Sequence, residues 1–289
     1  MNVSLIITTY NWPAALDMTF ASVARQSLLP QEIIVTDDGS TSSTADVVAA
    51  WRSRLAIPVR HLWQEDNGFR VARCRNRAIA AARNDYIVQI DGDMILHPRC
   101  VEDHVTCARE DCFIQGVRVY LSPNATAARL AGRSTRIGLF SSGLQRRAYA
   151  LRSPLLSRLT SKAGAKLGGI QSCNQSFWRR HALEVNGYDE RFNEWGLEDR
   201  EFAARLLHIG LLRNYVRHRA VAYHMHHATR ASSGENPFEG LMAATLARRA
   251  IWCEQGINSH VDLLGCNSLK IAQTACVPES SHSPPSRSD

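Results

Sequence analysis

Apolar and polar residues alternate in blocks along the first 93 residues of the chain. Short apolar runs, each closed by polar or acidic residues, are separated by stretches whose apolar residues recur at helical spacing. This alternation of buried strands and helices predicts an α/β fold around a mostly parallel, doubly wound sheet. The predicted strands cover 3–9, 32–40, 58–65 and 85–93, and the predicted helices cover 14–27, 43–55 and 71–84.

The polar residues that close these strands lie where such sheets bind ligands. Residues 8–11, 37–40 and 91–93 each end an apolar run, and the carboxyl ends of parallel strands share one edge of a sheet. Neither the G-x-G-x-x-G pattern of dinucleotide-binding proteins nor the Walker A pattern occurs in the chain. A phosphate group bound at this edge must therefore be held by other residues.

The pattern is weaker in the remainder of the chain. From 265 onwards the residues are polar, rich in Ser and Pro and without periodicity, which predicts a disordered tail. Strands are predicted over 113–122 and 212–227, a strand leading into a helix over 169–183, a helix that Gly210 closes, and a further helix over 238–256.

Composition sets the broad class of protein. The chain has 289 residues, 45% of them hydrophobic, and no apolar run near the ~18 residues of a membrane span. The amino terminus has no basic region and no small-residue cleavage site, so no secretory signal is predicted. The eight cysteines form no C-x-x-C pair. We therefore expect a soluble cytoplasmic protein with reduced thiols.

The net charge of +7 comes from one segment. Between Asp111 and Glu184 there is no acidic residue, whereas twelve arginines and lysines occur, so the rest of the chain is net negative. The densest part is the Arg-rich stretch 125–168. One interpretation is that this basic segment is a solvated face of the protein. The others are that it binds an anionic membrane surface or an anionic substrate.

Two carboxylates, Asp91 and Asp93, end the predicted strand in "VQIDGDMIL". Buried charges are costly unless they are paired. A divalent cation such as Mn²⁺ or Mg²⁺ would neutralise both, because such ions prefer carboxylate oxygens and are commonly shared with substrate phosphates. The D-x-D pattern alone is equally typical of a solvated turn.

The order of these motifs resembles the family-2 glycosyltransferases, which have the GT-A fold. "VSLIITTYN", "EIIVTDDGST", a basic helix and "DYIVQIDGD" resemble the nucleotide-binding half of that family. "NGYDERFNEWGLEDREFAARL" resembles the acceptor-side W-G-x-E-D motif of galactosyltransferases and chondroitin polymerases. The resemblance covers about 3–227 and implies that 1–105 binds a nucleotide sugar. It also implies that 106–230 is the acceptor-binding and catalytic half; 231–264 is then a helical region and 265–289 the tail.

The resemblance implies a role for several donor-side residues. Thr8 and Tyr10 would line the uracil and ribose, with the Tyr10 ring available for stacking. Asp38 would accept a hydrogen bond from the uracil. Arg70 would approach the base or the phosphates, or else be only a helix-start cation. Asp91 would face the ribose and the metal.

The same resemblance implies the catalytic and metal-binding residues. Asp93 would ligate the metal together with His224, for which His226 is the competing choice. Asp199 matches the general base, and Glu198 would contact the sugar or the acceptor. Two residues have open alternatives: Trp195 is a platform under a sugar ring or plain core, and Asn174 is a sugar contact or a turn residue.

These roles imply an inverting, metal-dependent transfer of a sugar from a UDP-sugar to a hydroxyl of a glycan or lipid-linked glycan, in synthesis of bacterial surface polysaccharide or lipopolysaccharide. An anionic membrane surface at the inner face of the cell membrane is a further expected partner. One alternative is a sugar-phosphate nucleotidyltransferase, although "TTYNWPAA" lacks the Gly-rich basic loop of that class. A nucleic-acid-binding protein using the basic segment ranks below both, because that segment has few aromatic residues.

Overall fold

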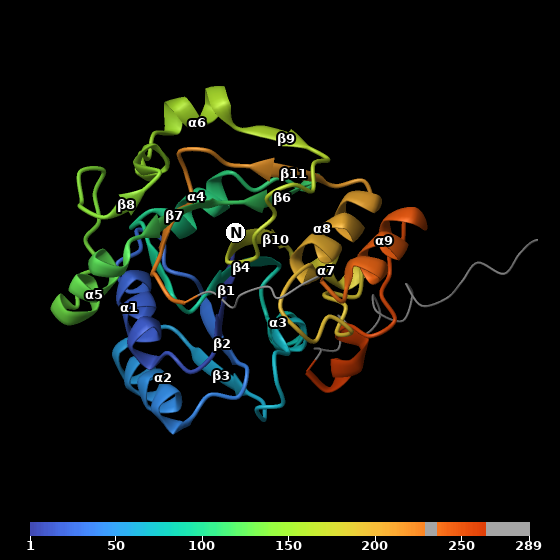
Figure 1. Ribbon diagram of the computed structural model, residues 1–289, viewed down its shortest axis with the longest axis horizontal. Helices are drawn as coiled ribbons and strands as arrows, with labels where there is room; N and C mark the ends of the chain where they lie inside the picture. Colours follow the sequence, from blue (N-terminus) through green and yellow to red (C-terminus); the bar gives the residue numbers. More distant parts are fainter. Residues whose placement is uncertain (229–235, 264–289) are drawn as a thin grey trace, which may run out of the picture.

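An eight-stranded sheet forms the centre of the protein, with its strands in the order β3-β2-β1-β4-β10-β6-β11-β9 (Figure 1). The structure is a computed structural model and describes residues 1–228 and 236–263. The predicted α/β fold is confirmed, because the first four strands are parallel and alternate with helices. The elements of this half are β1 (Val3–Thr9), α1 (Pro13–Val23), β2 (Glu32–Asp37), α2 (Ser42–Arg54), β3 (Val59–Trp63), α3 (Val71–Ala81) and β4 (Tyr86–Asp91).

The central strands β1 and β4 are buried on both sides because helices cover both faces of the sheet. Ile6 of β1 points to one face and packs in the core beneath α3 and α8, whereas its neighbours Leu5 and Ile7 pack on the opposite face with α1 and α2. This follows from the two-residue period of a strand. Every residue of β1 is buried as a result.

The topological switch point of the sheet lies between β1 and β4. From β1 the chain runs outward through β2 and β3, then returns to place β4 on the other side of β1. Thr8 lies opposite Asp91 in this parallel pairing. The connections therefore diverge at the carboxyl ends of these two strands, which is where open α/β sheets bind ligands.

The second half of the chain continues the same sheet. β10 (Asn174–Trp178) pairs antiparallel with both β4 and β6 (Cys112–Gln115), and β11 (Leu212–Tyr215) and β9 (Lys162–Gly164) follow. The helices of this half are α4 (Cys100–Thr106), α7 (Arg179–Glu184), α8 (Glu198–His208) and α9 (Glu239–Ala247), with a short 3₁₀ helix η2 (Ile257–Leu263) packed against α3.

Two strands predicted as single units are each divided between two sheets. The 113–122 segment forms β6 and then β7 (Val117–Leu121), and 212–227 forms β11 and then β12 (Val221–His224). The first break is at Gly116, where a Cβ would lie 2.4 Å from Nδ2 of Asn174. Only a residue without a side chain lets the chain cross here from one sheet to the other.

The second sheet has the order β5-β12-β7-β8, with β5 (Met94–Leu96) and β8 (Leu144–Gln145) added to the two strands above. β5 follows directly after the acidic pair, and β12 pairs antiparallel with it. The Met225 amide donates to the Asp93 carbonyl oxygen at 3.0 Å. The histidines that follow β12 are thereby held next to the end of β4.

The Arg-rich stretch is mostly ordered into short elements at the rim of the molecule. It contains α5 (Pro123–Gly132), the 3₁₀ helix η1 (Arg147–Ala150) and α6 (Pro154–Thr160) before β9 (Figure 1). Ser122 and Ser153 cap α5 and α6 through their side chains. The predicted disorder of 265–289 concerns residues outside the described ones. Among those described, no helix has the length and apolar character needed to span a membrane.

Candidate active site

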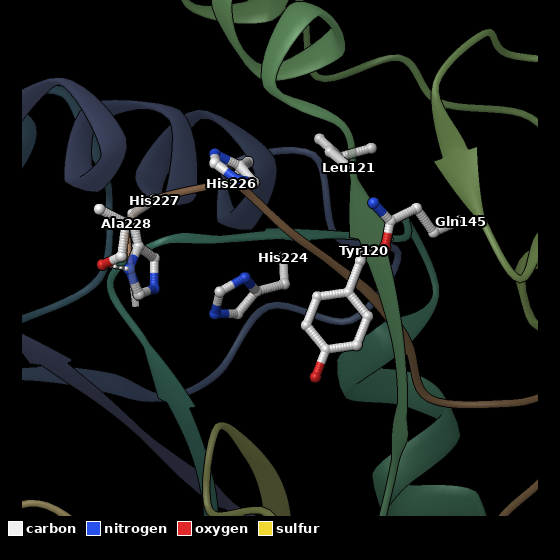
Figure 2. A pocket seen from close by; sticks show the side chains of 7 residues that line it. All are labelled: Tyr120, Leu121, Gln145, His224, His226, His227 and Ala228. Carbon is white, nitrogen blue, oxygen red and sulfur yellow. Dashed lines mark hydrogen bonds between the residues drawn. The ribbon is translucent and has the colours of Figure 1, made fainter. Parts of the chain in front are cut away.

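A pocket of about 400 Å³ opens beside the end of β12 (Figure 2). Its walls come from the second sheet and from the turn after β12, so residues far apart in the sequence meet there. The lining residues are Tyr120, Leu121, Gln145, His224, His226, His227 and Ala228.

Asp93 and two histidines converge next to this pocket. Oδ2 of Asp93 lies 3.4 Å from Nε2 of His224 and 3.2 Å from Nε2 of His227. One ligand atom from each of the three residues lies within 4.8 Å of the others. Oδ1 of Asp93 and Nδ1 of His224 are buried without a hydrogen-bond partner. A mixed set of one carboxylate and two imidazoles suits Mn²⁺ or a similar divalent ion, so these residues fit a metal.

The two histidines have different environments. Burial lowers the pKa of His224, and the Asp93 carboxylate opposes that shift. His227 is more exposed, and its hydrogen bond to Asp93 raises its pKa to about 9. Without a bound cation, an imidazolium at His227 therefore supplies the positive charge that Asp93 requires.

His226, the competing choice for a ligand, is not part of this group. Figure 2 shows its ring pointing away from the neighbouring rings of His224 and His227. Its backbone amide donates to Oγ1 of Thr126 at 2.8 Å. Because β12 ends at His224, strand alternation no longer decides which side chains share a side, and His227 reaches back toward Asp93 instead.

Arg75 of α3 connects the acidic pair of β4 with the acidic pair of α8. Its guanidinium lies 3.4 Å from Oδ1 of Asp91 and 3.0 Å from Oε1 of Glu198, and it is stacked over the Tyr188 ring at 5.3 Å. Burial raises the pKa of Asp91 to about 6, although Arg75 opposes the shift. Asp91 thus faces Arg75, and it is not among the three residues that form the candidate metal group.

Asp199 is adjacent to Glu198 in the first turn of α8. Leu197, in the left-handed region at φ +70°, turns the chain into the helix. The helix dipole stabilises both negatively charged side chains at this amino-terminal position. Burial raises the pKa of Asp199 to about 7, with a further contribution from the Glu198 charge, while Arg75 opposes it. A carboxyl group with this pKa is suited to accept a proton near neutral pH.

The predicted uridine contacts lie along the sheet edge. Thr8 is buried at the end of β1, and its hydroxyl has no hydrogen-bond partner among the described residues. Tyr10, two residues on, is 47% exposed and donates to Oδ2 of Asp66 at 3.0 Å. Both therefore lie at or just after the carboxyl end of β1, one with an available hydroxyl and one with an exposed ring.

Asp38 and Arg70 bind each other at the start of α3. Oδ2 of Asp38 accepts from the Arg70 amide at 2.8 Å, and Oδ1 accepts from Nε2 of Gln64 at 2.7 Å. Burial raises the pKa of Asp38. The Arg70 guanidinium donates to the Glu65 carbonyl oxygen. In this structure Asp38 holds the amino terminus of the helix that carries Arg75.

The two residues with open alternatives have opposite outcomes. Trp195 is 56% exposed in the loop before α8, so the core interpretation is wrong. Asn174 is completely buried, and its side chain binds His104 Nε2 at 2.8 Å and the carbonyl oxygens of Val117 and Ala220. The amide nitrogen thus joins the two sheets and the amide oxygen binds a residue of α4, so both polar atoms are used within the protein and the predicted sugar contact at Asn174 is corrected.

Sequence reasoning missed Arg75 and His227. Arg75 lies four residues after Val71 and four before Ile79, so it is on the buried face of α3, where an arginine requires an acidic partner. That position was the available signal. Nothing in the sequence pointed to His227, because its contact depends on how the chain turns after Met225.

A family model described as glycosyl transferase family 2 matches residues 4–184, more than half of the chain. The chain belongs to glycosyl transferase family 2. A second model, described as the N-terminal domain of galactosyltransferase, matches residues 159–228. The two matches together cover both acidic pairs and the histidines after β12.

Curated relatives agree with this family. The chain is 28% identical over 226 residues to hyaluronan synthase of Pasteurella multocida. This match covers 73% of this chain and 23% of that protein. It is 27% identical over 222 residues to chondroitin synthase of P. multocida (71% and 23%), and 39% identical over 102 residues to validoxylamine A glucosyltransferase of Streptomyces hygroscopicus subsp. limoneus (35% and 22%). The chain thus spans less than a quarter of these relatives.

Solved structures share the fold. S. aureus TarS superposes with a TM-score of 0.60 at 17% identity, over 95% of this chain and 43% of TarS. TarS 1–349 in complex with UDP-GlcNAc superposes with a TM-score of 0.58 at 16% identity, over 95% of this chain and 73% of that one. At such identity the likeness supports the GT-A type of fold, and the chemistry of this chain rests on its own residues.

Proposed function

We propose that the protein transfers a sugar from a UDP-sugar to a hydroxyl group of a glycan acceptor, with inversion at the anomeric carbon. One observation carries the proposal: Arg75 binds Asp91 at the end of β4 and Glu198 at the start of α8, so a donor-side carboxylate lies close to the residue that precedes the candidate base Asp199. Membership of the family favours this reaction over nucleotidyl transfer and over nucleic-acid binding.

The donor is assigned to the carboxyl ends of β1 and β4. The available Thr8 hydroxyl and the exposed Tyr10 ring are suited to a ribose and a base. TarS 1–349, which shares the fold, forms a complex with UDP-GlcNAc, and this supports a UDP-sugar as the class of donor here.

We assign divalent-metal binding to Asp93, His224 and His227, with Mn²⁺ or Mg²⁺ as the proposed ion. The unpartnered Oδ1 of Asp93 and Nδ1 of His224 support a further polar partner at this position. When bound, such an ion supplies charge stabilisation to the diphosphate leaving group. Arg118 on β7 adds a cation nearby, since its guanidinium stacks over Tyr120, which itself lies against His224.

Asp199 is the proposed general base. Single displacement with inversion needs one carboxylate to take the proton of the incoming hydroxyl on the side opposite the leaving group. Glu198 is held by Arg75 and contributes its negative charge to the raised pKa of Asp199. Trp195, exposed in the preceding loop, would provide a flat apolar surface for the sugar of the donor or the acceptor.

The acceptor is proposed as a glycan or a lipid-linked glycan, as in synthesis of bacterial surface polysaccharide or lipopolysaccharide. The names of the P. multocida relatives, hyaluronan synthase and chondroitin synthase, support polysaccharide synthesis. Attachment to an anionic membrane surface at the inner face of the cell membrane belongs to the same proposal.

A screen of UDP release across UDP-sugars with Mn²⁺ tests the proposal, with Asp199→Asn and Asp93→Ala beside the unmodified protein. We expect one donor to be turned over. Asp199→Asn should still bind UDP in calorimetry but lose transfer, and Asp93→Ala should lose the metal-dependent part of UDP binding. Absence of binding by every UDP-sugar, with and without Mn²⁺, would rule the function out, and equal transfer by Asp199→Asn would remove the base.

A further inference from the structure

The short helix α6 (Pro154–Thr160) has its apolar and polar sides reversed relative to a normal surface helix. Its only buried side chain is Ser157, whose hydroxyl lies 3.1 Å from that of Ser161. Leu155 and Leu159 are 68% and 72% exposed, and Leu156 between them is also exposed. A cluster of exposed leucines on a folded protein marks a surface that binds another protein or a membrane.

The cations of the basic segment divide into two groups. Several are used within the protein, as when Arg152 binds both oxygens of Asp103 at 2.7 and 2.8 Å, Arg133 pairs with Asp17, and Arg118 packs against Tyr120. Others are exposed and, within 1–228 and 236–263, take part in no ion pair. This second group comprises Arg136, Arg146, Arg147, Arg158, Lys162 and Lys166.

Three members of this second group lie on or immediately after α6. Arg158 is on the helix between Leu155 and Leu159, Lys162 begins β9, and Lys166 follows that strand. Figure 1 shows α6 and β9 together at the rim of the molecule, away from α2 and α3. Exposed leucines and unpaired cations therefore share one projecting element, which is the pattern of a segment that binds an anionic lipid surface.

A basic cleft of about 320 Å³ lies beside α6. Its walls include Arg158 and Arg219, together with Arg109, which is already paired with Asp111, and no carboxylate of the described residues lines the cleft. Nε of Arg219 is buried without a hydrogen-bond acceptor, and the nearest acid, Asp103 at 3.9 Å, is already bound by Arg152. Guanidinium groups bind phosphate oxygens with matched geometry, so the cleft suits a phospholipid headgroup.

From these observations we infer that α6 and the adjacent β9 dock the protein onto an anionic phospholipid membrane. Leu155 and Leu159 enter the interfacial layer, the unpaired cations face the lipid phosphates, and the cleft at Arg158 and Arg219 receives a headgroup. A neutral lipid surface would bury the leucines but would not pair with the cations. A free polyanion would pair with the cations but would not bury the leucines. A bilayer with anionic lipids satisfies both.

Co-sedimentation with phosphatidylcholine vesicles, with and without phosphatidylglycerol, tests this inference. The unmodified protein should bind the anionic vesicles at least about tenfold more tightly, and added salt should weaken that binding. The double variant Leu155→Ser/Leu159→Ser should weaken it by on the order of tenfold or more. Arg158→Gln/Lys162→Gln should cost about fivefold for each cation and flatten the salt dependence.

Matched controls use residues of the same type elsewhere on the surface. Leu29 and Leu246 are each 40% exposed, so Leu29→Ser/Leu246→Ser controls for the loss of two surface leucines, and Arg83→Gln controls for a lost exposed cation. These variants should bind anionic vesicles as the unmodified protein does. Equal binding by the α6 variants and these controls would overturn the inference.

Two further results would also overturn it. One is equal affinity of the unmodified protein for neutral and anionic vesicles. The other is a lipid-free dimer in sedimentation velocity that Leu155→Ser/Leu159→Ser converts to a monomer without changing vesicle binding, because the leucines would then cover a second copy of the chain. The vesicle assays contain no sugar donor, so their outcome is independent of whether any UDP-sugar is bound or turned over.

Discussion

The two acidic pairs of the site, Asp91 with Asp93 and Glu198 with Asp199, divide their work in the same way. In each pair one carboxylate binds the buried Arg75, namely Asp91 and Glu198. The other member of each pair has a different environment. Asp93 lies against two histidines, whereas Asp199 is buried, and this burial raises its pKa to about 7. One shared cation thus holds one acid of each pair, and the other acid of each pair is the one proposed to bind the metal or to act as the base.

The largest effect should separate the members of the second pair. Asp199→Asn should reduce transfer by roughly 10²–10⁴-fold, the usual contribution of a positioned base, with UDP affinity unchanged. Glu198→Gln should leave a larger residual rate, because Glu198 acts through Arg75 and through the pKa of Asp199. Initial rates and UDP calorimetry on both variants measure this, and an equal loss in the two would show that the pair does not divide its roles.

Removing the shared cation should destabilise the whole arrangement. Arg75→Met leaves Glu198 and Asp91 without their partner in a mostly buried setting, which typically costs about 3–5 kcal/mol. Denaturant unfolding at neutral pH measures the loss. The double variant Arg75→Met/Glu198→Gln should recover part of it, since the uncompensated buried charge is gone; no recovery would mean that Arg75 stabilises by packing against Tyr188 instead.

Metal binding should depend on Asp93 of the first pair and on the histidines beside it. Asp93→Ala should weaken binding of Mn²⁺ together with UDP by at least about tenfold, since even outer-shell changes cost roughly 10–100-fold. His227→Ala should weaken it as well, whereas His226→Ala should not, because His226 is not part of the Asp93 group and its ring points away from those of His224 and His227 (Figure 2). Calorimetric titrations of Mn²⁺ into the UDP-bound protein compare the three. A stronger effect at His226 than at His227 would reverse the assignment.

The rate of transfer should depend on pH through Asp199. A base acts in its ionised form, and burial raises the pKa of this carboxyl to about 7, so the rate should be half-maximal near pH 7 and fall about tenfold per unit below it. In Glu198→Gln the acid limb should move to lower pH, because the neighbouring negative charge is removed. A rate that is flat down to about pH 5 would contradict this protonation state.

The smallest effect is expected outside both pairs. Trp195→Ala should raise the KM of donor or acceptor about 2–10-fold with little change in kcat, since the exposed ring provides contact area rather than chemistry. Trp195→Phe should keep most of the affinity. A loss of stability in Trp195→Ala comparable to that in Arg75→Met would contradict its placement on the surface.

Much of the first half of the chain was predictable because its signals are local. Runs such as 3–9 and 85–93 place apolar residues on both alternating sides of a strand, which is typical of a sheet covered by helices on both faces, and polar residues follow at their carboxyl ends. The same reasoning failed over 113–122 and 212–227. There, a local pattern shows that a strand exists but not that the chain changes sheets at Gly116 or after Tyr215.

The sequence by itself determined the α/β alternation, the polar edge at the carboxyl ends of the strands and the two acidic pairs, since each depends on residues a few positions apart. Only the tertiary structure decided that Arg75 joins those pairs, that His227 rather than His226 faces Asp93, that Asn174 is buried between two sheets, and that the leucines of α6 face outward. These facts depend on contacts across as many as 134 positions, as between Asp93 and His227. Such contacts are set by strand order and turn geometry, and no local periodicity encodes them.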